Sequence, residues 1–235
     1  MQVVILAGGL GTRIRTIAGD LPKSLVTVAG KPFIEHQLEL LKENGLNRVL
    51  LLIGYQGELI RNYVRSGSRY GMKVTYSLED PRKLMGTGGA LVGALTELED
   101  QFITLYGDSY LPVDFQTMIA WYRDQDRPAA MSVYKNDGKW DASNARVLGE
   151  RVIFYSKKAR KGEADYIDYG LSIFTREIIQ RYLTQPMPLD MALIQQDLVE
   201  GDELAAYRVK QRFYEIGKPE GLRELERYLE AGKAG

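Results

Sequence analysis

The sequence predicts an α/β fold with a Rossmann-like mixed, mainly parallel sheet and helices on both faces. In the first half of the chain, short apolar runs of strand length alternate with helical patterns. Such alternation is typical of parallel sheets, because parallel neighbours need a crossover connection that a helix supplies. From about residue 141 the pattern changes to short strands with tight polar turns. This change predicts a small antiparallel extension.

The first half contains four expected buried strands, each a short run rich in apolar and β-branched residues. These strands are expected at residues 3–7, 48–53, 73–77 and 102–106. Helical spacing of apolar residues predicts helices at residues 32–44, 57–65 and 90–95. A short extended piece is expected at 25–28.

The second half is expected to hold shorter strands and three helices. The strands are predicted at residues 129–134, 145–148, 151–155, 166–174, 205–209 and 212–214. The helices are predicted at residues 116–125 and 175–183 and from Pro219 onward, where proline suits a first helical turn. We find no internal repeat or linker, so residues 1–235 are expected to form a single domain.

The composition excludes several classes of protein. Lys+Arg and Asp+Glu both total 31, so no excess positive charge is available for general attraction to nucleic acid. The absence of cysteine rules out disulfides, thiolate nucleophiles and cysteine-bound metal. The longest apolar run, residues 49–53, is too short to span a bilayer, and the N-terminus lacks a signal-peptide pattern. We therefore expect a soluble cytoplasmic protein that binds neither nucleic acid nor membrane.

A glycine-rich loop follows the first strand and is closed by Pro22 and Lys23. It carries three glycines, a hydroxyl and two cations: Gly8, Gly9, Gly11, Thr12, Arg13 and Lys23. Glycines let the backbone approach a ligand closely, and successive backbone N–H groups can form an anion-binding concavity. The loop is therefore expected to hold a polyphosphate. A tight turn without a ligand is the alternative, and it leaves the hydroxyl and the two cations unexplained.

Two known phosphate-binding patterns are absent from this loop. A dinucleotide fingerprint would need a third glycine where Ile14 stands, which argues against a dehydrogenase. A Walker-type loop would need Gly-Lys-Ser/Thr after four intervening residues, and the sequence has none.

Two carboxylates are candidates for a metal site. Asp108 comes directly after a buried strand and Gly107, where it suits Mg²⁺, which prefers one or two carboxylates together with phosphate oxygens. A strand-end turn or a helix cap is the alternative role for Asp108. Glu215 also follows a short strand and precedes a helix. Its alternative is a surface acid favoured near a helix N-terminus.

These residues resemble the signature of the sugar-1-phosphate nucleotidyltransferases. The resemblance rests on residues 6–13 with Pro22–Lys23, and on later blocks at 86–90, 107–108 and 217–220 in the same order. It covers nearly the whole chain and implies a GT-A-like nucleotidyltransferase fold. The sequence is most similar to mannose- and heptose-1-phosphate guanylyltransferases, with N-acetylmuramate-1-phosphate uridylyltransferases next.

The resemblance implies that an NTP reacts with a sugar 1-phosphate to give an NDP-sugar and pyrophosphate, with Mg²⁺ as cofactor. It implies catalytic roles for Arg13, Lys23 and Asp108, and metal ligation by Asp108 and Glu215. The family usually has an aspartate where this chain has Glu215. It also implies a nucleotide-binding part at residues 1–115, a mainly sugar-phosphate-binding part at 129–218, and a C-terminal helix at 219–235.

The resemblance further implies two sets of binding residues. The nucleotide would be bound by Leu6, Ala7, Gly8, Gly9, Gly11, Thr12, Glu79, Gly86 and Thr87. The sugar phosphate would be bound by Asp108, Lys157, Asp168, Tyr169 and Gly170. Ser156 stands where an acid usually precedes the lysine, which is a departure from the family pattern. Trp140, Asp141 and Asn144 are further candidate sugar contacts.

The sequence says less about the nucleobase and the sugar of the substrates. A carboxylate such as Glu79 can accept hydrogen bonds from N1–H and N2–H₂ of guanine, which favours GTP; a solvated acidic loop is the alternative. Heptose or mannose 1-phosphate is the expected acceptor. Uridylyl, thymidylyl or cytidylyl transfer to another sugar 1-phosphate, or a non-catalytic nucleotide-binding module, are the other possibilities. The chain is expected to be a monomer or a homodimer.

Overall fold

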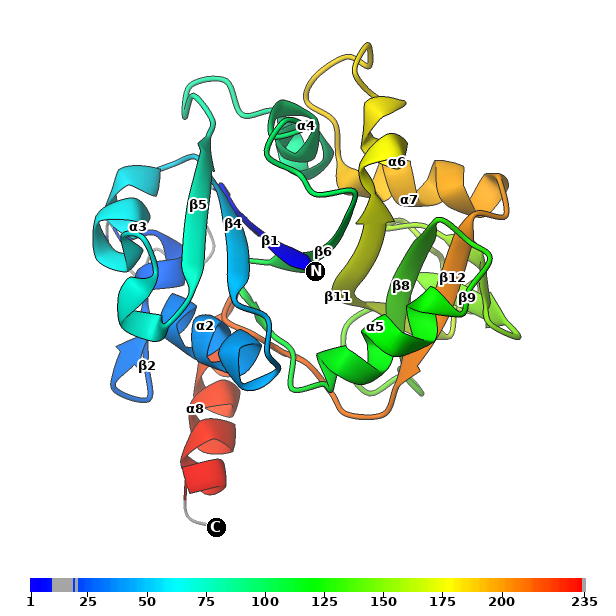
Figure 1. Ribbon diagram of the computed structural model, residues 1–235. Coiled ribbons are helices and arrows are strands. Elements are labelled where there is room, and N and C mark those ends of the chain that lie inside the picture. Colours follow the sequence, from blue (N-terminus) through cyan, green and yellow to red (C-terminus); the bar gives the residue numbers. More distant parts are fainter. Residues whose placement is uncertain (10–18, 20, 234–235) are drawn as a thin grey trace. The chain divides into compact units, whose positions relative to one another are not determined.

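The computed structural model describes residues 1–9, 19 and 21–233, and the chain divides into two compact units. Unit 1 contains Met1 and residues 85–104 and 113–212. Unit 2 contains residues 2–84, 105–112 and 213–235. Each unit is therefore assembled from separate stretches of sequence (Figure 1). The expected division into a nucleotide-binding part (1–115), a mainly sugar-phosphate-binding part (129–218) and a C-terminal helix (219–235) concerns function and stays a prediction.

Unit 2 is built on three parallel strands in the order β5-β4-β1. They are β1 (Gln2–Ala7), β4 (Arg48–Ile53) and β5 (Lys73–Leu78). Most residues of β1 and β4 are buried, as expected for strands covered on both faces. Helices α2 (Phe33–Glu43) and α3 (Gly57–Val64) form the crossovers between these strands (Figure 1).

The remaining elements of unit 2 bring the end of the chain to its beginning. Three short elements precede α2: η2 (Lys23–Leu25), β2 (Thr27–Val28) and β3 (Lys31–Pro32). The 3-10 turn η3 (Ser68–Tyr70) follows α3. The short strand β7 (Ser109–Tyr110) pairs antiparallel with β13 (Tyr214–Glu215), and α8 (Pro219–Lys233) follows. One apolar cluster joins β2, α2, β13 and α8: Val26, Val28, Phe33, Ile216, Leu222 and Leu225.

Unit 1 contains the mixed part of the sheet, with strand order β11-β8-β12-β10-β9. Strand β8 (Ala129–Lys135) pairs antiparallel with β11 (Tyr166–Thr175) and parallel with β12 (Leu204–Val209). Strand β10 (Arg151–Tyr155) pairs antiparallel with both β12 and β9 (Ala145–Leu148). Strand β6 (Gln101–Tyr106) begins in unit 1, and its last two residues belong to unit 2.

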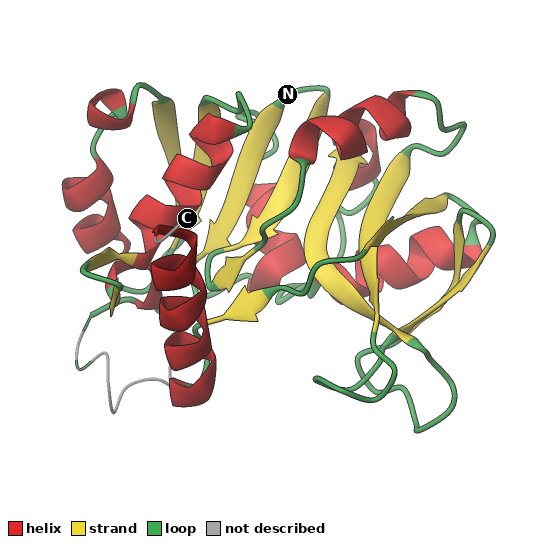
Figure 2. Cartoon of the chain, turned by 90° about the horizontal axis from the view of Figure 1, so that it is seen from below, coloured by secondary structure: helices red, strands yellow, loops and turns green. Residues whose placement is uncertain are grey.

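The strands of unit 1 carry helices on both faces (Figure 2). Helix α5 (Phe115–Arg123) contacts β12 through the rings of Trp121 and Tyr207, whose centroids are 5.1 Å apart. Helix α7 (Met191–Glu200) packs on β10 and β12. It also contacts α4 (Gly86–Gly93), while α6 (Arg176–Gln180) lies against β11.

The predicted α/β class, the mainly parallel first half and the antiparallel extension are confirmed. Several boundaries differ. The piece expected to be extended from residue 25 begins with the 3-10 turn η2, and α2 starts after Pro32, which ends β3. Helix α6 ends at Gln180 instead of residue 183. Helix α7 was not predicted, because its apolar spacing begins directly after a proline-rich loop.

Candidate functional site

Three residues of unit 2 meet where three parallel strands end. Gly8, Gly54 and Glu79 come directly after β1, β4 and β5. A Cβ atom on Gly8 would lie 3.1 Å from Glu79 Oε2 and 3.4 Å from the Gly54 nitrogen. A Cβ on Gly54 would lie 3.3 Å from the same carboxylate oxygen. The carboxylate therefore packs against bare backbone at the carboxyl edge of the sheet, where ligands bind in open α/β folds.

A second group of unit 2 is built on the turn after β6. The Gly107 nitrogen donates to the Leu6 carbonyl at 2.9 Å, which sets the turn beside the end of β1. A Cβ atom on Gly107 would lie 2.9 Å from Cα and Cβ of Ala7, so only glycine fits without a shift. Ser24 Oγ donates to the Gly107 carbonyl, and Gln37 Nε2 donates to the carbonyls of Tyr106 and Ser109. These bonds fix the main chain on both sides of Asp108.

An ion pair joins two of the residues expected to be catalytic, Lys23 and Asp108. Lys23 Nζ lies 2.8 Å from Asp108 Oδ2, and the two side chains are 20% and 34% exposed. The ammonium group also lies 3.6 Å from the Cβ position of Gly217, so the chain after β13 borders the pair. Segments that begin at residues 23, 107 and 215 therefore meet here. Both side chains are partly exposed, and a cation held in place in this way suits the binding of phosphate groups.

The position of Glu215 follows from the β7–β13 pairing. Glu215 stands opposite Ser109, and the Ile216 nitrogen donates to the Asp108 carbonyl at 3.0 Å. Ile216 is fully buried in the apolar cluster with α8, which fixes this stretch of main chain. Asp108 and Glu215 thus lie on adjoining main-chain segments. In the part of the chain that the structure describes, no cluster of three or more acidic or histidine side chains could hold a metal.

This donor set fits Mg²⁺. Mg²⁺ is usually bound by one or two carboxylates, with water and substrate phosphates completing the shell, so a cluster of three protein ligands is not required. Asp108 is partly exposed and Glu215 is exposed, which leaves both carboxylates accessible to a metal–phosphate complex. Whether they bind one metal ion stays a prediction.

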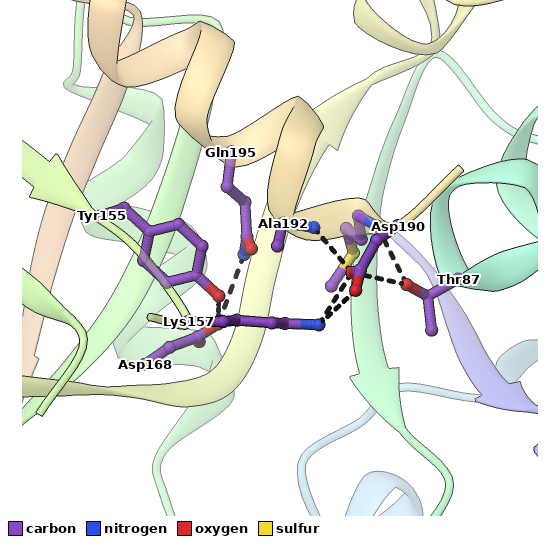
Figure 3. A network of polar contacts seen from close by, with 8 residues as sticks. Thr87, Tyr155, Lys157, Asp168, Asp190, Ala192 and Gln195 are labelled. Carbon is purple, nitrogen blue, oxygen red and sulfur yellow. Dashed lines mark hydrogen bonds and ion pairs between the residues drawn. The ribbon is translucent and has the colours of Figure 1, made fainter. Parts of the chain in front are cut away.

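Unit 1 holds a separate polar network around Lys157 (Figure 3). Lys157 Nζ lies 2.7 Å from each carboxylate oxygen of Asp190. Asp190 caps α7 by accepting from the Ala192 nitrogen at 3.0 Å, and it accepts from Thr87 Oγ1 at 3.3 Å. Desolvation acts to raise the pKa of Asp190, but the hydrogen bonds from Lys157, Ala192 and Thr87 outweigh it and lower that pKa. The aspartate is therefore charged at neutral pH.

Asp168 belongs to the same network, but its pKa is shifted in the opposite direction from that of Asp190. Its carboxylate accepts from the Gly170 nitrogen at 2.9 Å, from Tyr155 Oη at 3.2 Å and from Gln195 Nε2 at 3.4 Å. Desolvation nevertheless dominates and raises the pKa of Asp168. The Gln195 Oε1 atom is buried without a hydrogen-bond partner.

The other expected ligand residues of unit 1 have internal contacts. Tyr169 is 1% exposed and its hydroxyl donates to the Arg212 carbonyl, so its ring belongs to the core. Gly170 has φ of +90°, which favours glycine at this turn. Gly86, with φ of +79°, would place a Cβ 2.5 Å from the Leu189 carbonyl oxygen. The nitrogens of Gly88 and Gly89 donate to that same oxygen. Residues 86–89, expected to be a turn before the helix, therefore form the first turn of α4 and bind the segment before α7.

The structure brings the expected residues together in two groups. Unit 2 gathers Leu6, Ala7, Gly8, Lys23, Glu79, Asp108 and Glu215 at strand ends, whereas unit 1 gathers Thr87, Lys157, Asp168 and Gly170. Gly11, Thr12 and Arg13 lie outside the described residues. Gly9 is described, and apart from its chain neighbours no atom of the described residues lies within 4 Å of its Cβ position.

Sequence reasoning missed Asp190, Gln195 and Gln37. The signal for Asp190 was present, because an aspartate directly before the apolar run of residues 191–194 is typical of a helix N-cap. The two glutamines carry no such signal. Their roles depend on side-chain contacts with residues 23 or more positions away in the sequence.

Comparisons with known proteins identify the family of the chain. A family model described as nucleotidyl transferase matches residues 2–232. D-glycero-alpha-D-manno-heptose 1-phosphate guanylyltransferase of Aneurinibacillus thermoaerophilus is 27% identical over 235 residues, covering 98% of this chain and 99% of the relative. The Campylobacter jejuni protein of that name is 29% identical over 195 residues, covering 79% and 80%.

Solved structures are similar over nearly the same length. HddC from Yersinia pseudotuberculosis, complexed with GMP-PN, is 28% identical with a TM-score of 0.78, and covers 97% of this chain and 99% of that one. The inositol-1-phosphate CTP transferase from T. maritima has a TM-score of 0.80 at 18% identity, which supports the fold alone. Among the described residues, no helix has the length and apolar character needed to cross a membrane.

Proposed function

Because the chain belongs to the nucleotidyl transferase family, we propose that it transfers a guanylyl group from GTP to a heptose or mannose 1-phosphate. A phosphate oxygen of the sugar 1-phosphate attacks the α-phosphorus of GTP. The bond from that phosphorus to the β-phosphate bridging oxygen breaks, and pyrophosphate leaves with the electron pair. The products are a GDP-sugar and pyrophosphate.

One observation carries the choice of guanylyl transfer. The similarity to the heptose-1-phosphate guanylyltransferase of Aneurinibacillus thermoaerophilus covers 98% of this chain and 99% of the relative. The carboxylate of Glu79 against Gly8 and Gly54 supports the choice physically. A carboxylate can accept from N1–H and N2–H₂ of guanine together, whereas uracil and thymine offer one imide N–H between two carbonyls.

The described cations suit the charge problem of this reaction. Two anions must approach each other, and phosphoryl-type transfer depends mainly on alignment and charge neutralisation. In unit 2, Lys23 supplies a cation held in place by Asp108, and in unit 1 Lys157 supplies one held by Asp190. The attacking phosphate is already anionic, so no general base is needed. Arg13 is proposed to bind the triphosphate.

We propose Asp108 and Glu215 as the residues that hold Mg²⁺. When bound, the ion would neutralise charge on the nucleotide phosphates. Lys23, 2.8 Å from Asp108, is proposed to contact the reacting phosphates. Gly8 and Gly9 would let the nucleotide approach the backbone. Gly86 and Thr87 are proposed as further nucleotide-binding residues.

A screen of pyrophosphate release tests this function. Purified protein is incubated with Mg²⁺ and each of GTP, UTP, dTTP, CTP and ATP, against heptose, mannose and glucose 1-phosphates. We expect the fastest release with GTP and a heptose or mannose 1-phosphate. Fastest release with another NTP overturns guanylyl transfer. Nucleotide binding without any pyrophosphate release would indicate a non-catalytic module.

Two further properties stay proposals of the same kind. A cytoplasmic location is consistent with a nucleotide substrate, and fractionation of cells that produce the protein tests it. A monomer or homodimer is expected, and light scattering on the purified protein distinguishes the two.

A further inference from the structure

Lys157 is held by one carboxylate through both of its oxygens. The Nζ atom lies 2.7 Å from Asp190 Oδ1 and 2.7 Å from Oδ2. The two side chains are 47% and 48% exposed, so the ammonium group remains accessible from solvent. An ammonium group has three N–H donors, and a carboxylate that accepts through both oxygens leaves one donor direction for an incoming anion.

The carboxylate of Asp190 is fixed independently of Lys157. Asp190 Oδ1 accepts from the Ala192 nitrogen in the first turn of α7 and from Thr87 Oγ1 at the start of α4. Thr87 Oγ1 in turn accepts from the Met191 nitrogen at 2.9 Å. Figure 3 shows Ala192, Thr87 and Lys157 all contacting the Asp190 carboxylate. The acceptor is thus attached to two helix N-termini.

A lysine needs such support more than an arginine does. Its side chain is long and flexible and carries a compact charge, so an unsupported ammonium group samples many positions. Lys157 lies in the turn after β10, where the next residues are exposed. An ion pair of this exposure contributes little to folding stability. Its value lies in the position that it gives to the ammonium group.

We propose that Asp190 is a positioning residue that holds Lys157 ready for the phosphate group of the sugar 1-phosphate. The inference rests on the proposed function for the identity of the anion. Asp190 itself does not contact the reacting atoms. Removal of its charge should therefore weaken the binding of the sugar 1-phosphate, with little effect on the binding of the nucleotide.

Asp190→Asn is the informative variant. Asparagine is a good N-cap and its amide oxygen can still accept from the Ala192 nitrogen, so α7 should keep its start. The charge that attracts Lys157 is lost. We expect the KM for the sugar 1-phosphate to rise roughly tenfold, by analogy with residues that orient metal ligands, while the KM for GTP and kcat change little. Glu200→Gln, at the exposed end of the same helix, is the matched control and should behave as wild type.

A double-mutant cycle separates positioning from a general structural effect. In a Lys157→Met background, Asp190→Asn should have no further effect on the KM, because there is no ammonium group left to hold. An equal tenfold effect in both backgrounds overturns the inference. A lower KM in Asp190→Asn also overturns it, because Asp190 would then compete with the substrate for Lys157.

Calorimetric binding of mannose 1-phosphate and heptose 1-phosphate keeps the two proposals apart. If wild type binds a sugar 1-phosphate but releases no pyrophosphate, the proposed function fails, and a weaker affinity of Asp190→Asn still supports positioning. If wild type is active and Asp190→Asn has unchanged affinity, the inference alone fails. A wild-type protein that binds neither sugar phosphate overturns both.

Discussion

The Nζ atom of Lys23 lies 2.8 Å from Oδ2 of Asp108, across 85 positions of sequence. The pair is possible because Gly107 brings the turn after β6 against the end of β1, and because Ser24 donates to the Gly107 carbonyl. A cation and a candidate metal ligand are thereby placed side by side. The predictions for unit 2 depend on this pair.

Loss of the Lys23 charge should reduce the rate. We expect Lys23→Met to lower kcat/KM for GTP by about a hundredfold, or about 3 kcal/mol, as for the loss of one preorganised charge-stabilising donor. Lys31→Met is a matched control, since Lys31 pairs with Glu39 and is similarly buried. Steady-state pyrophosphate release measures both. Equal rates in the two variants would remove Lys23 from the proposed mechanism.

Neutralising Asp108 should abolish the Mg²⁺-dependent release of pyrophosphate. Asp108→Asn keeps the shape of the side chain and an oxygen that can accept from Lys23, but it loses the charge that a hard divalent cation needs. Pyrophosphate release should fall by at least about a hundredfold. The exposed Asp126→Asn serves as control. Normal release at ordinary Mg²⁺ concentrations would move the metal site elsewhere.

The identity of the base should depend on Glu79. In Glu79→Gln the amide presents one acceptor and one donor, so it no longer matches the two donors of guanine. The ratio of kcat/KM for GTP to that for UTP should fall roughly tenfold to a hundredfold, the range for a hydrogen bond to a charged group. The exposed Glu58→Gln on α3 should leave the ratio unchanged. An unaltered ratio in Glu79→Gln would show that another group reads the base.

Gly107→Ala should destabilise the fold. The added Cβ atom would lie 2.9 Å from Ala7 and from the Leu6 carbonyl oxygen, so β1 or the turn must shift. Such overpacking costs about 1–3 kcal/mol, which lowers the melting temperature by at least about 2 °C in a chain of this size. Gly232→Ala has open space in α8 and should be neutral or slightly stabilising. Identical melting curves for Gly107→Ala and wild type would contradict this account.

Asp168 should make stability fall as pH rises. Burial raises its pKa, so above about pH 4, the unfolded value, the folded chain holds the proton that the unfolded chain has lost. Asp168→Asn removes this term, and its amide oxygen can still accept from the Gly170 nitrogen. The variant should be at least as stable as wild type at neutral pH, with a smaller decrease in stability above pH 4. Denaturant unfolding at several pH values measures this. A variant that loses stability relative to wild type as pH rises would refute the raised pKa.

The sequence predicted the parallel part of the fold well, because buried strands such as β4 are continuous apolar runs that glycine and polar residues interrupt sharply. The functional roles expected for Lys23, Asp108 and Lys157 stay predictions; the structure shows that these three residues lie in ion pairs. The partner of Lys157 was missed. A sequence pattern reveals a helix cap at Asp190 at best, whereas the contact with Lys157 depends on how α7 packs on β10. Chain order likewise does not reveal that β13 pairs with β7.

Guanylyl transfer itself is tested most directly by a competition experiment. The protein is given an equimolar mixture of GTP, UTP, dTTP and CTP with D-glycero-α-D-manno-heptose 1-phosphate and Mg²⁺, and the nucleotide-sugar products are identified by mass spectrometry. We predict that the GDP-linked heptose is the main product and that pyrophosphate forms in equal amount. A main product carrying another base, or no nucleotide-sugar at all, would contradict the account.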